Sequence, residues 1–452
     1  MLAIMDTSRL TPATAFPVET TVRDALYDRI VLSRPEIELM GTPPFVRLER
    51  IQQLGFVSRI WPGARHTRFE HSLGVLHLTR LAIHHLRAIP GGDWLTDEDA
   101  RVAAAAALLH DVGHYPFSHA IEELGPPIVP HERGGRRIIE GPHVAPILER
   151  AWGVDPARVA AMVDPAGQEL PPADNLLRGV LSGALDMDKL DYLPRDARAC
   201  HVPYGGVDSS RLLDALTIVH VPREGRTSAA RVAISEKGIS PLHSLINARQ
   251  EMFDNVYWHH TNRACMVMLL RATQEALLAG ELQPEELVTY DDASLLIGLA
   301  ADTMPAATRR LARALQERHI HKRAVEISSR AFELYARLGN LYFDPLARRD
   351  VEIRLAAALA EETGQDVPAD AVLIDIPKPE KWRTDVWVAF ERPPVGYASL
   401  MPWRDVVGLT DEDFKRYEEH RRLIRIVAAE PFRAALAASW ERLLLPLLGA
   451  AL

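Results

Sequence analysis

Cysteine is scarce in this chain of 452 residues, which contains only Cys200 and Cys265. Two thiols cannot build a disulfide framework, and they cannot supply the four thiolates of a structural zinc site. Because disulfides are typical of oxidising compartments, their absence favours a reducing one. We therefore expect a cytoplasmic protein.

Long hydrophobic runs and a surplus of positive charge are missing as well. The longest apolar stretches, residues 102–109 and 443–452, are much shorter than the ~18 residues that indicate a membrane span. Residues 1–6 lack the basic segment and apolar core of a signal peptide. Lysine and arginine total 52 against 61 acidic residues, a net charge of −9, so there is no general electrostatic footprint for nucleic acid. We expect no membrane partner, and nucleic acid is possible but not indicated.

What is present is the composition of a folded protein, with 47% hydrophobic and 25% charged residues, and most of it is typical of helices. Thr96 and the acidic residues after it form a helix start, and an alanine- and leucine-rich run leads from there to His110. A long helical stretch is expected over residues 242–279. Two more helices are expected over residues 411–429 and 432–445, with prolines between and after them.

Strands are expected in one region, where residues 371–376 and 386–390 are short apolar runs flanked by a proline-containing segment. We place both in one small mixed lobe. By length alone the chain has room for about three domains. The elements predict a mainly α fold with a helical main body over residues 1–345 and a smaller α+β C-terminal lobe over residues 346–452.

The first chemically informative stretch is the end of the alanine-rich helix, where His110, Asp111 and His114 follow one another closely. Near a helix end, neighbouring side chains can reach one ion, and His114 returns to the same side. Alone, the His-Asp pair is explained better by a capped helix end with a hydrogen-bonded histidine. The pair gains weight from His71 upstream and Asp188 downstream. Together they offer two nitrogens and two oxygens, a set that suits Mn, Fe or Zn better than Ca and leaves positions open for water and substrate.

The order of these residues resembles the HD-domain phosphohydrolases, in particular the deoxynucleoside triphosphate triphosphohydrolases. The similarity includes the branch with a sterile-alpha-motif domain and its bacterial relatives, although we expect no sterile-alpha-motif domain here. It covers roughly residues 22–275 and is weaker beyond. The matching strings are Thr42-Pro43, Gln53-Leu54-Gly55, Pro62-Gly63-Ala64, Arg68-Phe69-Glu70-His71-Ser72-Leu73-Gly74, His110-Asp111-Val112-Gly113-His114-Tyr115-Pro116-Phe117-Ser118-His119 and Asp186-Met187-Asp188-Lys189-Leu190-Asp191-Tyr192.

The resemblance implies that the main body is an HD-domain helical body, with its metal motifs within residues 65–196, and it implies a role for each matching position. The metal ligands would be His71, His110, Asp111 and Asp188. The catalytic group beside them would be His114, Glu122 and His131. The phosphate-binding residues would be Arg68, Lys189 and Arg249. The sugar and base would contact Gln53, Tyr192, Asp196 and Tyr257. Because the family has aspartate at the position of Glu122, the reach of this longer carboxylate is open. Without the family, His131 is equally a surface histidine, and Tyr257 is more often a core aromatic.

The chain departs from this family at the guanine-nucleotide activator site. Alignment places Gly41, Val46 and Glu49 where the sterile-alpha-motif enzyme has aspartate, glutamine and arginine. None replaces the lost hydrogen bonds, so we expect the activator site to be absent. A second basic cluster is more simply a solvated helix face than a site for an effector phosphate or nucleic acid; it comprises Arg309, Arg310, Arg313, Arg318, Lys322 and Arg323.

The function expected from these observations is metal-dependent hydrolysis of dNTPs to deoxynucleoside and inorganic triphosphate. The cofactor would be a divalent transition metal (Mn, Fe or Zn), with Mg possible on the substrate phosphates. Two alternatives stay open: hydrolysis of other nucleoside polyphosphates, such as dinucleoside tetraphosphates or alarmones, and a nucleotide or single-stranded nucleic-acid binding module. The family resemblance also implies a homo-oligomer.

Overall fold

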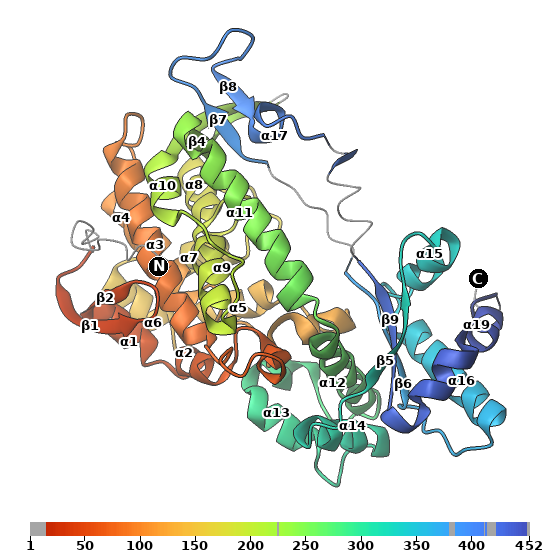
Figure 1. Ribbon diagram of the computed structural model, residues 1–452. Helices are drawn as coiled ribbons and strands as arrows, with labels where there is room; N and C mark the ends of the chain where they lie inside the picture. Colours follow the sequence, from red (N-terminus) through yellow and green to blue (C-terminus); the bar gives the residue numbers. More distant parts are fainter. Residues whose placement is uncertain (1–14, 224–225, 379–384, 411, 414–421, 450–452) are drawn as a thin grey trace.

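The computed structural model describes residues 15–223, 226–378, 385–410, 412–413 and 422–449 (Figure 1). The helices used below are α1 (Arg34–Met40), α2 (Pro43–Val46), α3 (Arg68–Ala88), α4 (Asp97–Leu109), α5 (His131–Ile139), α6 (Ala145–Ile147), α7 (Pro156–Val163), α8 (Pro172–Leu181), α9 (Met187–Cys200), α10 (Ser209–Ala215), α11 (Ile239–Met252), α12 (His260–Leu278), α13 (Asp292–Leu299), α14 (Ala306–Gln316), α15 (Phe332–Asn340), α16 (Pro345–Thr363), α17 (Trp403–Val406) and α19 (Arg433–Gly449). The strands are β1 (Val18–Asp24), β2 (Asp28–Ser33), β3 (Leu216–Arg223), β4 (Arg226–Ser235), β5 (Lys322–Ile327), β6 (Val372–Asp375), β7 (Trp387–Ala389), β8 (Leu400–Pro402) and β9 (Ile424–Ala428). The predicted fold class, mainly α with a smaller α+β part near the C-terminus, is confirmed.

The main body is built around α3, which packs against α4 and α9. The predicted start of α4 is confirmed, because the Thr96 side chain accepts a hydrogen bond from Asp99 N and caps the helix. Residues 102–109 are all buried, and the small alanines among them let α4 lie close to its neighbours. The helix ends at Leu109, so His110 begins the turn that follows.

The helical stretch expected over residues 242–279 is divided in two, which corrects the prediction of one continuous helix. A π-type turn at Phe253–Tyr257 ends α11, and His259 has an extended backbone (φ −60°, ψ 132°) before α12. The break is packed rather than loose: Trp258 stacks on Phe253, and the guanidinium of Arg263 lies 4.1 Å from the Trp258 ring centroid.

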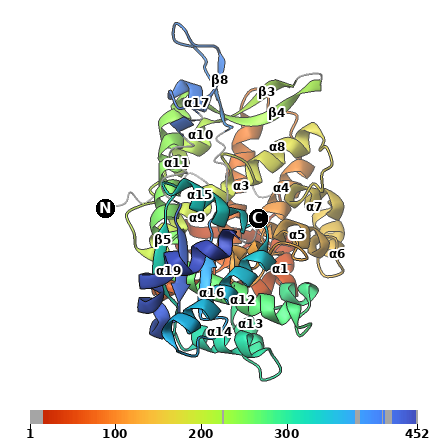
Figure 2. The ribbon, with the colours of Figure 1, turned by 90° about the vertical axis from the view of Figure 1, so that its right-hand side faces the viewer.

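The two predicted strands near the C-terminus exist, but they belong to different sheets. β6 pairs with β9 in the antiparallel order β5-β9-β6, and α16 and α19 share a buried core with this sheet. Figure 2 views this lobe from the side that faces right in Figure 1. β7 instead runs parallel to β4, in the sheet β3-β4-β7-β8 on the main body.

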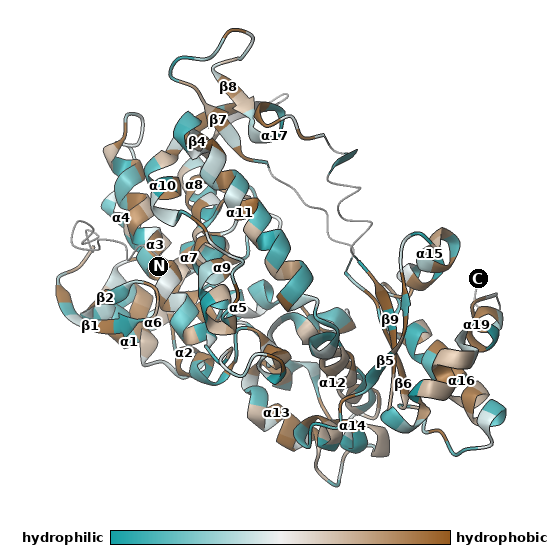
Figure 3. Ribbon diagram, viewed as in Figure 1, coloured by the Kyte–Doolittle hydropathy of each residue, from teal (hydrophilic) through white to brown (hydrophobic). Residues whose placement is uncertain are grey.

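The helix predicted over residues 411–429 is wrong over its C-terminal part, whereas residues 412–413 are helical. Residues 424–428 form β9, every residue of which is buried between β5 and β6. The β-branched Ile424, Ile426 and Val427 favour this pleated, two-sided burial, and brown segments mark β6 and β9 in Figure 3. Residues 411 and 414–421 lie outside the described part of the chain. The helix predicted over residues 432–445 is α19, which continues through Pro446 to Gly449.

The packing crosses the expected division at residue 345 in both directions. β5, which precedes residue 345, pairs with β9, whereas Val388 and Trp403, which follow it, belong to the main core. The domain boundary therefore stays a prediction.

Candidate metal centre and active site

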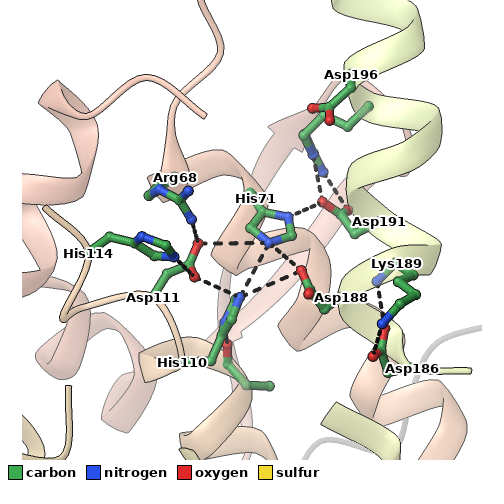
Figure 4. A network of polar contacts seen from close by, with 12 residues as sticks. Arg68, His71, His110, Asp111, His114, Asp186, Asp188, Lys189, Asp191 and Asp196 are labelled. Carbon is green, nitrogen blue, oxygen red and sulfur yellow. Dashed lines mark hydrogen bonds and ion pairs between the residues drawn. The ribbon is translucent and has the colours of Figure 1, made fainter. Parts of the chain in front are cut away.

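The four side chains expected to bind metal converge from three elements (Figure 4). α3 carries His71, the turn after α4 carries His110 and Asp111, and the first turn of α9 carries Asp188. The Nε2 atoms of His71 and His110 lie 3.3 Å apart, and Asp188 Oδ1 lies 3.0 Å from His71 Nε2 and 4.0 Å from His110 Nε2. Asp111 Oδ1 lies 3.3 Å from His110 Nε2. His71, His110 and Asp188 offer ligand atoms that all lie within 4.8 Å of one another and could hold one small cation, and the Asp111 carboxylate lies beside this group.

Both histidines direct the same nitrogen to this point. The Nδ1–H of His110 donates to Ala107 O at 2.8 Å, and that of His71 donates to Asp191 Oδ2 at 2.7 Å. Each Nε2 is thereby the atom that can bind a metal. Burial disfavours a charged His71, but the carboxylates of Asp188 and Asp191 outweigh it and raise the pKa of His71 to about 10. The cluster thus has negative charge in excess, and a divalent cation fits the donor set.

A second layer of buried residues holds His71 in place. Asp191 accepts hydrogen bonds from Arg195 Nε at 2.8 Å and from the Tyr27 hydroxyl at 2.9 Å, and Arg195 also pairs with Asp24. A Cβ at Gly74 would lie 1.8 Å from Asp191 Oδ1, so only glycine lets α3 approach α9 here. Sequence analysis missed these supporting residues. The feature that could have identified them is Asp191, which stands in the same motif as Asp188 and on the same helix.

Asp111 is fixed by two cationic or donor groups. Arg68 Nη1 donates to its Oδ2 at 2.5 Å, and His114 Nε2 lies 3.1 Å from its Oδ1. Burial disfavours the charged carboxylate, but Arg68 and the neighbouring histidines hold the pKa of Asp111 well below its usual range. The carbonyls of the turn are also bound, because Arg47 donates to His114 O at 2.6 Å. The turn that carries Asp111 is therefore rigid.

The three residues expected to form a catalytic group are brought together beside Asp111. The rings of His114 and His131 stack with centroids 3.7 Å apart, and His131 Nδ1–H donates to Glu122 Oε1 at 2.7 Å. Glu122 lies on the 3₁₀ helix η4 (Ser118–Leu124), and His131 begins α5. The open question about the longer carboxylate is answered geometrically, since Glu122 reaches His131.

The charges within this group are divided between the two imidazoles. Burial, with Arg68 and His131 nearby, lowers the pKa of His114 well below its usual range. Burial also disfavours the charged form of His131, but Glu122 outweighs it and raises the pKa of His131. The same contacts hold the pKa of Glu122 below its usual value despite its burial. A neutral imidazole thus stacks on one that readily holds a proton.

A third histidine in this group was missed by sequence analysis. His119 Nδ1 lies 3.6 Å from Glu122 Oε2, and its ring centroid lies 4.8 Å from that of His114. Its side chain is 64% exposed, so it faces outward from the buried pair. The sequence feature that could have identified His119 is its position at the end of the motif that begins at His110.

The residues expected at the sugar and base form a connected set near α9. Asp196 accepts hydrogen bonds from His66 Nε2 and from the Tyr257 hydroxyl, both at 2.7 Å. The Tyr192 ring lies between His71 and Tyr257, with centroids 6.5 Å from each. The Oε1 atom of Gln53 is buried and has no hydrogen-bond partner among the described residues. An unpaired buried acceptor of this kind suits a ligand hydroxyl.

The three cations expected at the phosphates occupy different places. Arg68 is paired with Asp111, next to the metal ligands. Lys189 Nζ is bound to Asp186 Oδ2 at 2.6 Å and Gly183 O at 2.8 Å. Lys189 and Arg249 both line a cavity on the α8 side of α9. The structure thus does not gather the three cations around one point.

The other expectations from sequence are placed as follows. Glu49, at an expected activator position, is exposed, and the absence of the activator site stays a prediction. In the basic cluster, side-chain donors bind oxygens of Asp302, Asp370, Arg59 and Glu326, which supports a paired, solvated face. Among the helices the structure describes, none has the length and apolar content to cross a bilayer.

Comparison with known proteins supports the HD assignment. A model of the HD domain matches residues 68–154, and a model of the HD associated region matches residues 207–390. An uncharacterized protein of Methanocaldococcus jannaschii is 29% identical over 360 residues, which are 80% of this chain and 70% of that protein. YwfO of Bacillus subtilis is 33% identical over 240 residues, 53% of this chain and 51% of YwfO.

Two further likenesses concern a named enzyme and a solved fold. The deoxynucleoside triphosphate triphosphohydrolase SAMHD1 of Homo sapiens is 26% identical over 283 residues, 56% of this chain and 44% of that enzyme. The crystal structure of a hypothetical protein from Aquifex aeolicus has a TM-score of 0.67 at 24% identity, covering 92% of this chain and 99% of that one. Apart from the archaeal protein, the chain spans about half the length of these curated relatives or less. This chain is therefore an HD-domain protein with an HD associated region, and deoxynucleoside triphosphate triphosphohydrolases are among its distant relatives.

Proposed function

We propose that this protein is a metal-dependent phosphohydrolase that cleaves dNTPs into deoxynucleoside and inorganic triphosphate. The observation that carries the proposal is the convergence of His71, His110, Asp111 and Asp188 beside the stacked pair of His114 and His131. The HD domain and the metal-suited cluster support metal-dependent phosphohydrolysis. The dNTP substrate is proposed from the likeness to the named triphosphohydrolase.

The reaction requires an activated water, stabilisation of charge on the phosphate oxygens and a proton donor for the leaving oxygen. A bound divalent cation lowers the pKa of a coordinated water and draws charge from the phosphate oxygens. The oxygen of water would form a bond to the α-phosphorus and lose a proton to solvent, and the bond from that phosphorus to the 5′ oxygen would break. The 5′ oxygen then takes up a proton and leaves as the deoxynucleoside hydroxyl, while the three phosphates leave together as triphosphate.

The proton donor in this scheme is the His131–Glu122 pair. Glu122 favours the protonated form of His131, and the neutral His114 separates that proton from Asp111. His119 lies at the outer side of the same group and can exchange protons with solvent. Proton transfer through such a chain requires atoms within hydrogen-bond reach, which the 2.7 Å contact of His131 with Glu122 provides.

The nucleoside would be held by the set around Asp196. Gln53 and Asp196 can bond the sugar hydroxyl, Tyr192 can pack against the sugar ring, and Tyr257 lies where the base would stack. A pocket built to bond a hydroxyl discriminates well against analogues that lack it. Arg68, Lys189 and Arg249 remain the proposed phosphate contacts.

Product analysis tests the proposal. Protein with Mn²⁺ and no added nucleotide activator is incubated separately with the four dNTPs, the NTPs and a dinucleoside tetraphosphate, in water enriched in ¹⁸O. Deoxynucleoside and triphosphate, with the label on the triphosphate, are the expected products. Label on the nucleoside hydroxyl, or release of single phosphates, would contradict attack at the α-phosphorus.

The two alternatives give different results in the same assay. Cleavage of the dinucleotide without cleavage of dNTPs would retain the metal centre and replace the substrate. For a binding module, nothing would be cleaved, and the His110→Ala, Asp111→Ala double variant would bind nucleotide as wild type does. The homo-oligomer and the cytoplasmic location stay predictions.

A further inference from the structure

A basic cavity of about 480 Å³ lies between α8, α9, α11 and β4, beside the residues that lead into β7. Its cationic side chains are Arg178 from α8, Lys189 from α9, Arg231 from β4 and Arg249 from α11. Among the described lining residues, Asp385 is the one acidic residue, and it is exposed. Such a concentration of positive charge is notable in a chain with a net charge of −9.

Two of these arginines have no polar partner among the residues that the structure describes. Arg178 Nε is buried and has no hydrogen-bond partner among the described residues. Arg231 likewise pairs with no carboxylate or carbonyl in the part of the chain that the structure describes. A buried donor of a charged group left unpaired costs free energy, and a ligand with oxygens can recover it. Both arginines line the same cavity, so one anionic ligand could bind both.

The walls between the helices leave room for such a ligand. Gly179, Ser182, Gly183 and Ala184 line the cavity, and none of them fills it with a large side chain. Lys189 is already paired with Asp186, so its charge is largely compensated. Arg249 also makes an interaction within the protein. Arg178 and Arg231 therefore supply the positive charge that has no partner among the described residues, and their planar donor groups suit phosphate oxygens better than an ammonium does.

The cavity lies directly beside the metal centre. Lys189 follows Asp188 in the first turn of α9, and the two side chains point to opposite sides of that turn (Figure 4). Tyr192 experiences the charge of Arg249 on the cavity side as well as that of Asp188 on the metal side. A nucleotide held at the metal is thus within one helix turn of the cavity.

We propose that this basic cavity binds a phosphate-rich anion through Arg178 and Arg231. The anion has two possible sources with the same chemistry. The first source is the distal phosphates of a nucleotide bound at the metal centre, and this possibility rests on the proposed function. The second source is a separate polyphosphate.

Binding of inorganic tripolyphosphate to the full chain tests the proposal by calorimetry. It is measured with Mn²⁺ bound and again after EDTA treatment, which removes the contribution of the metal. The Arg178→Gln, Arg231→Gln double variant should bind about tenfold more weakly or worse in both conditions, since two charged hydrogen-bonding groups are lost. The matched control is Arg330→Gln, Arg337→Gln, which removes the same charge from two exposed sites and should bind as wild type does. Equal affinity of all three proteins, or no binding by wild type, would overturn the proposal.

Folding of the variant can be separated from binding. Because neither arginine has a partner in the described part of the chain, the double variant without ligand should melt no lower than wild type. If it does not fold, Arg178→Lys, Arg231→Lys retains the charge but loses the planar donors. Weaker tripolyphosphate binding by that protein supports the proposal, and unchanged binding refutes it.

Competition identifies the source of the anion. If the distal phosphates of the substrate occupy the cavity, tripolyphosphate competes with dNTP and the double variant raises KM more than it lowers kcat. If the anion is separate, tripolyphosphate still binds to protein saturated with nucleotide. If the variant loses tripolyphosphate binding but no protein hydrolyses a nucleotide, the anion-binding cavity is supported and the proposed function is refuted.

Discussion

At the scale of single residues, the metal centre depends on how its ligands are held. His71 is 1% exposed, and its ring is fixed by Asp191, which in turn accepts from Arg195 and Tyr27. These outer contacts set which nitrogen faces the cation. They also place negative charge behind the imidazole, which strengthens it as a ligand when a cation takes the place of the proton on Nε2.

Replacing Asp191 with Asn should weaken metal binding about 10–100-fold while leaving all four proposed ligands in place. One amide oxygen cannot accept from His71, Arg195 and Tyr27 together, and the amide carries no charge. Calorimetric titration with Mn²⁺ measures the effect, with the exposed Asp93→Asn as control. Unchanged Mn²⁺ affinity would show that Asp191 does not support His71.

The proton-holding pair predicts a pH effect with a definite sign. Glu122 raises the pKa of His131, so the protonated form persists to higher pH than in an ordinary histidine. In Glu122→Gln that support is lost, and the alkaline limb of kcat/KM should move to lower pH as kcat falls. The exposed Glu149→Gln should not move it. A profile that shifts to higher pH, or not at all, would exclude His131 as the acid.

From the sequence, the proposed metal ligands could be identified, but the residues that hydrogen-bond to them could not. His71, His110, Asp111 and Asp188 stand in motifs whose residue types already suggest a metal. Tyr27, by contrast, reaches Asp191 across 164 residues, and no local pattern predicts such a contact. The orientation of Lys189 toward Asp186 rather than the metal ligands is equally a product of packing.

At the scale of elements, the close approach of α3 and α9 positions the centre. Gly74→Ala would place a Cβ 1.8 Å from Asp191 Oδ1 and 2.5 Å from Arg195 Nη2. Overpacking of this kind costs about 1–3 kcal/mol, which exceeds the ~1 kcal/mol that alanine gains over glycine in a helix. We expect a lower free energy of unfolding and weaker Mn²⁺ binding.

Gly339 in α15 provides the matched control, because a Cβ there meets nothing within 4 Å. Gly339→Ala should therefore raise the free energy of unfolding by up to ~1 kcal/mol through helix propensity alone. Urea denaturation of both variants measures the contrast. Equal changes in the two proteins would mean that α3 and α9 do not need glycine at their crossing.

α12 joins the catalytic group to the C-terminal sheet through one buried arginine. Arg263 donates to Glu123 at 2.8 and 3.0 Å and to Asp375 at 2.9 and 2.6 Å. Glu123 lies on η4 next to Glu122, and Asp375 ends β6. The position of the sheet is thereby linked to the element that carries the catalytic carboxylate.

Arg263→Met should destabilise the protein by about 3–5 kcal/mol, because two carboxylates lose their shared buried partner. Denaturation measures this, and adding Asp375→Asn should restore part of the loss by removing a buried carboxylate that keeps only its longer, 3.6 Å pair with Arg425. Arg354→Met, which removes an exposed pair with Asp350, should cost at most about 0.5 kcal/mol. A small loss in Arg263→Met would show that the link is not structural.

At this scale, local sequence patterns predict the strands but not which strands pair. Residues 371–376 and 386–390 were identified as strands from their apolar runs, yet β6 and β7 enter different sheets because their partners, β9 and β4, are far apart in sequence. Residues 424–428 read as part of a helix because periodicity alone cannot distinguish so short an apolar run from a buried helix segment. The segment forms a strand because it is buried on both faces between β5 and β6.

At the scale of the whole molecule, the mainly α architecture follows from composition and helix signals, while the arrangement of the lobe does not. The α3–α4–α9 packing brings motifs from residues 71, 110 and 188 to one point, and the resemblance to HD proteins anticipated that point. The route of the chain after residue 378, which adds β7 and β8 to the main body and then returns to place β9 between β5 and β6, has no local signature.

The central claim is that His71, His110, Asp111 and Asp188 bind one divalent cation on which hydrolysis depends. The most direct test is a titration of metal-stripped full chain with Mn²⁺, in which dNTP turnover and bound metal are followed together. We predict that triphosphate release rises with bound Mn²⁺ up to one ion per chain, and that His110→Ala with Asp111→Ala abolishes both. Full turnover by the stripped protein, or by a double variant that binds no metal, would contradict the account.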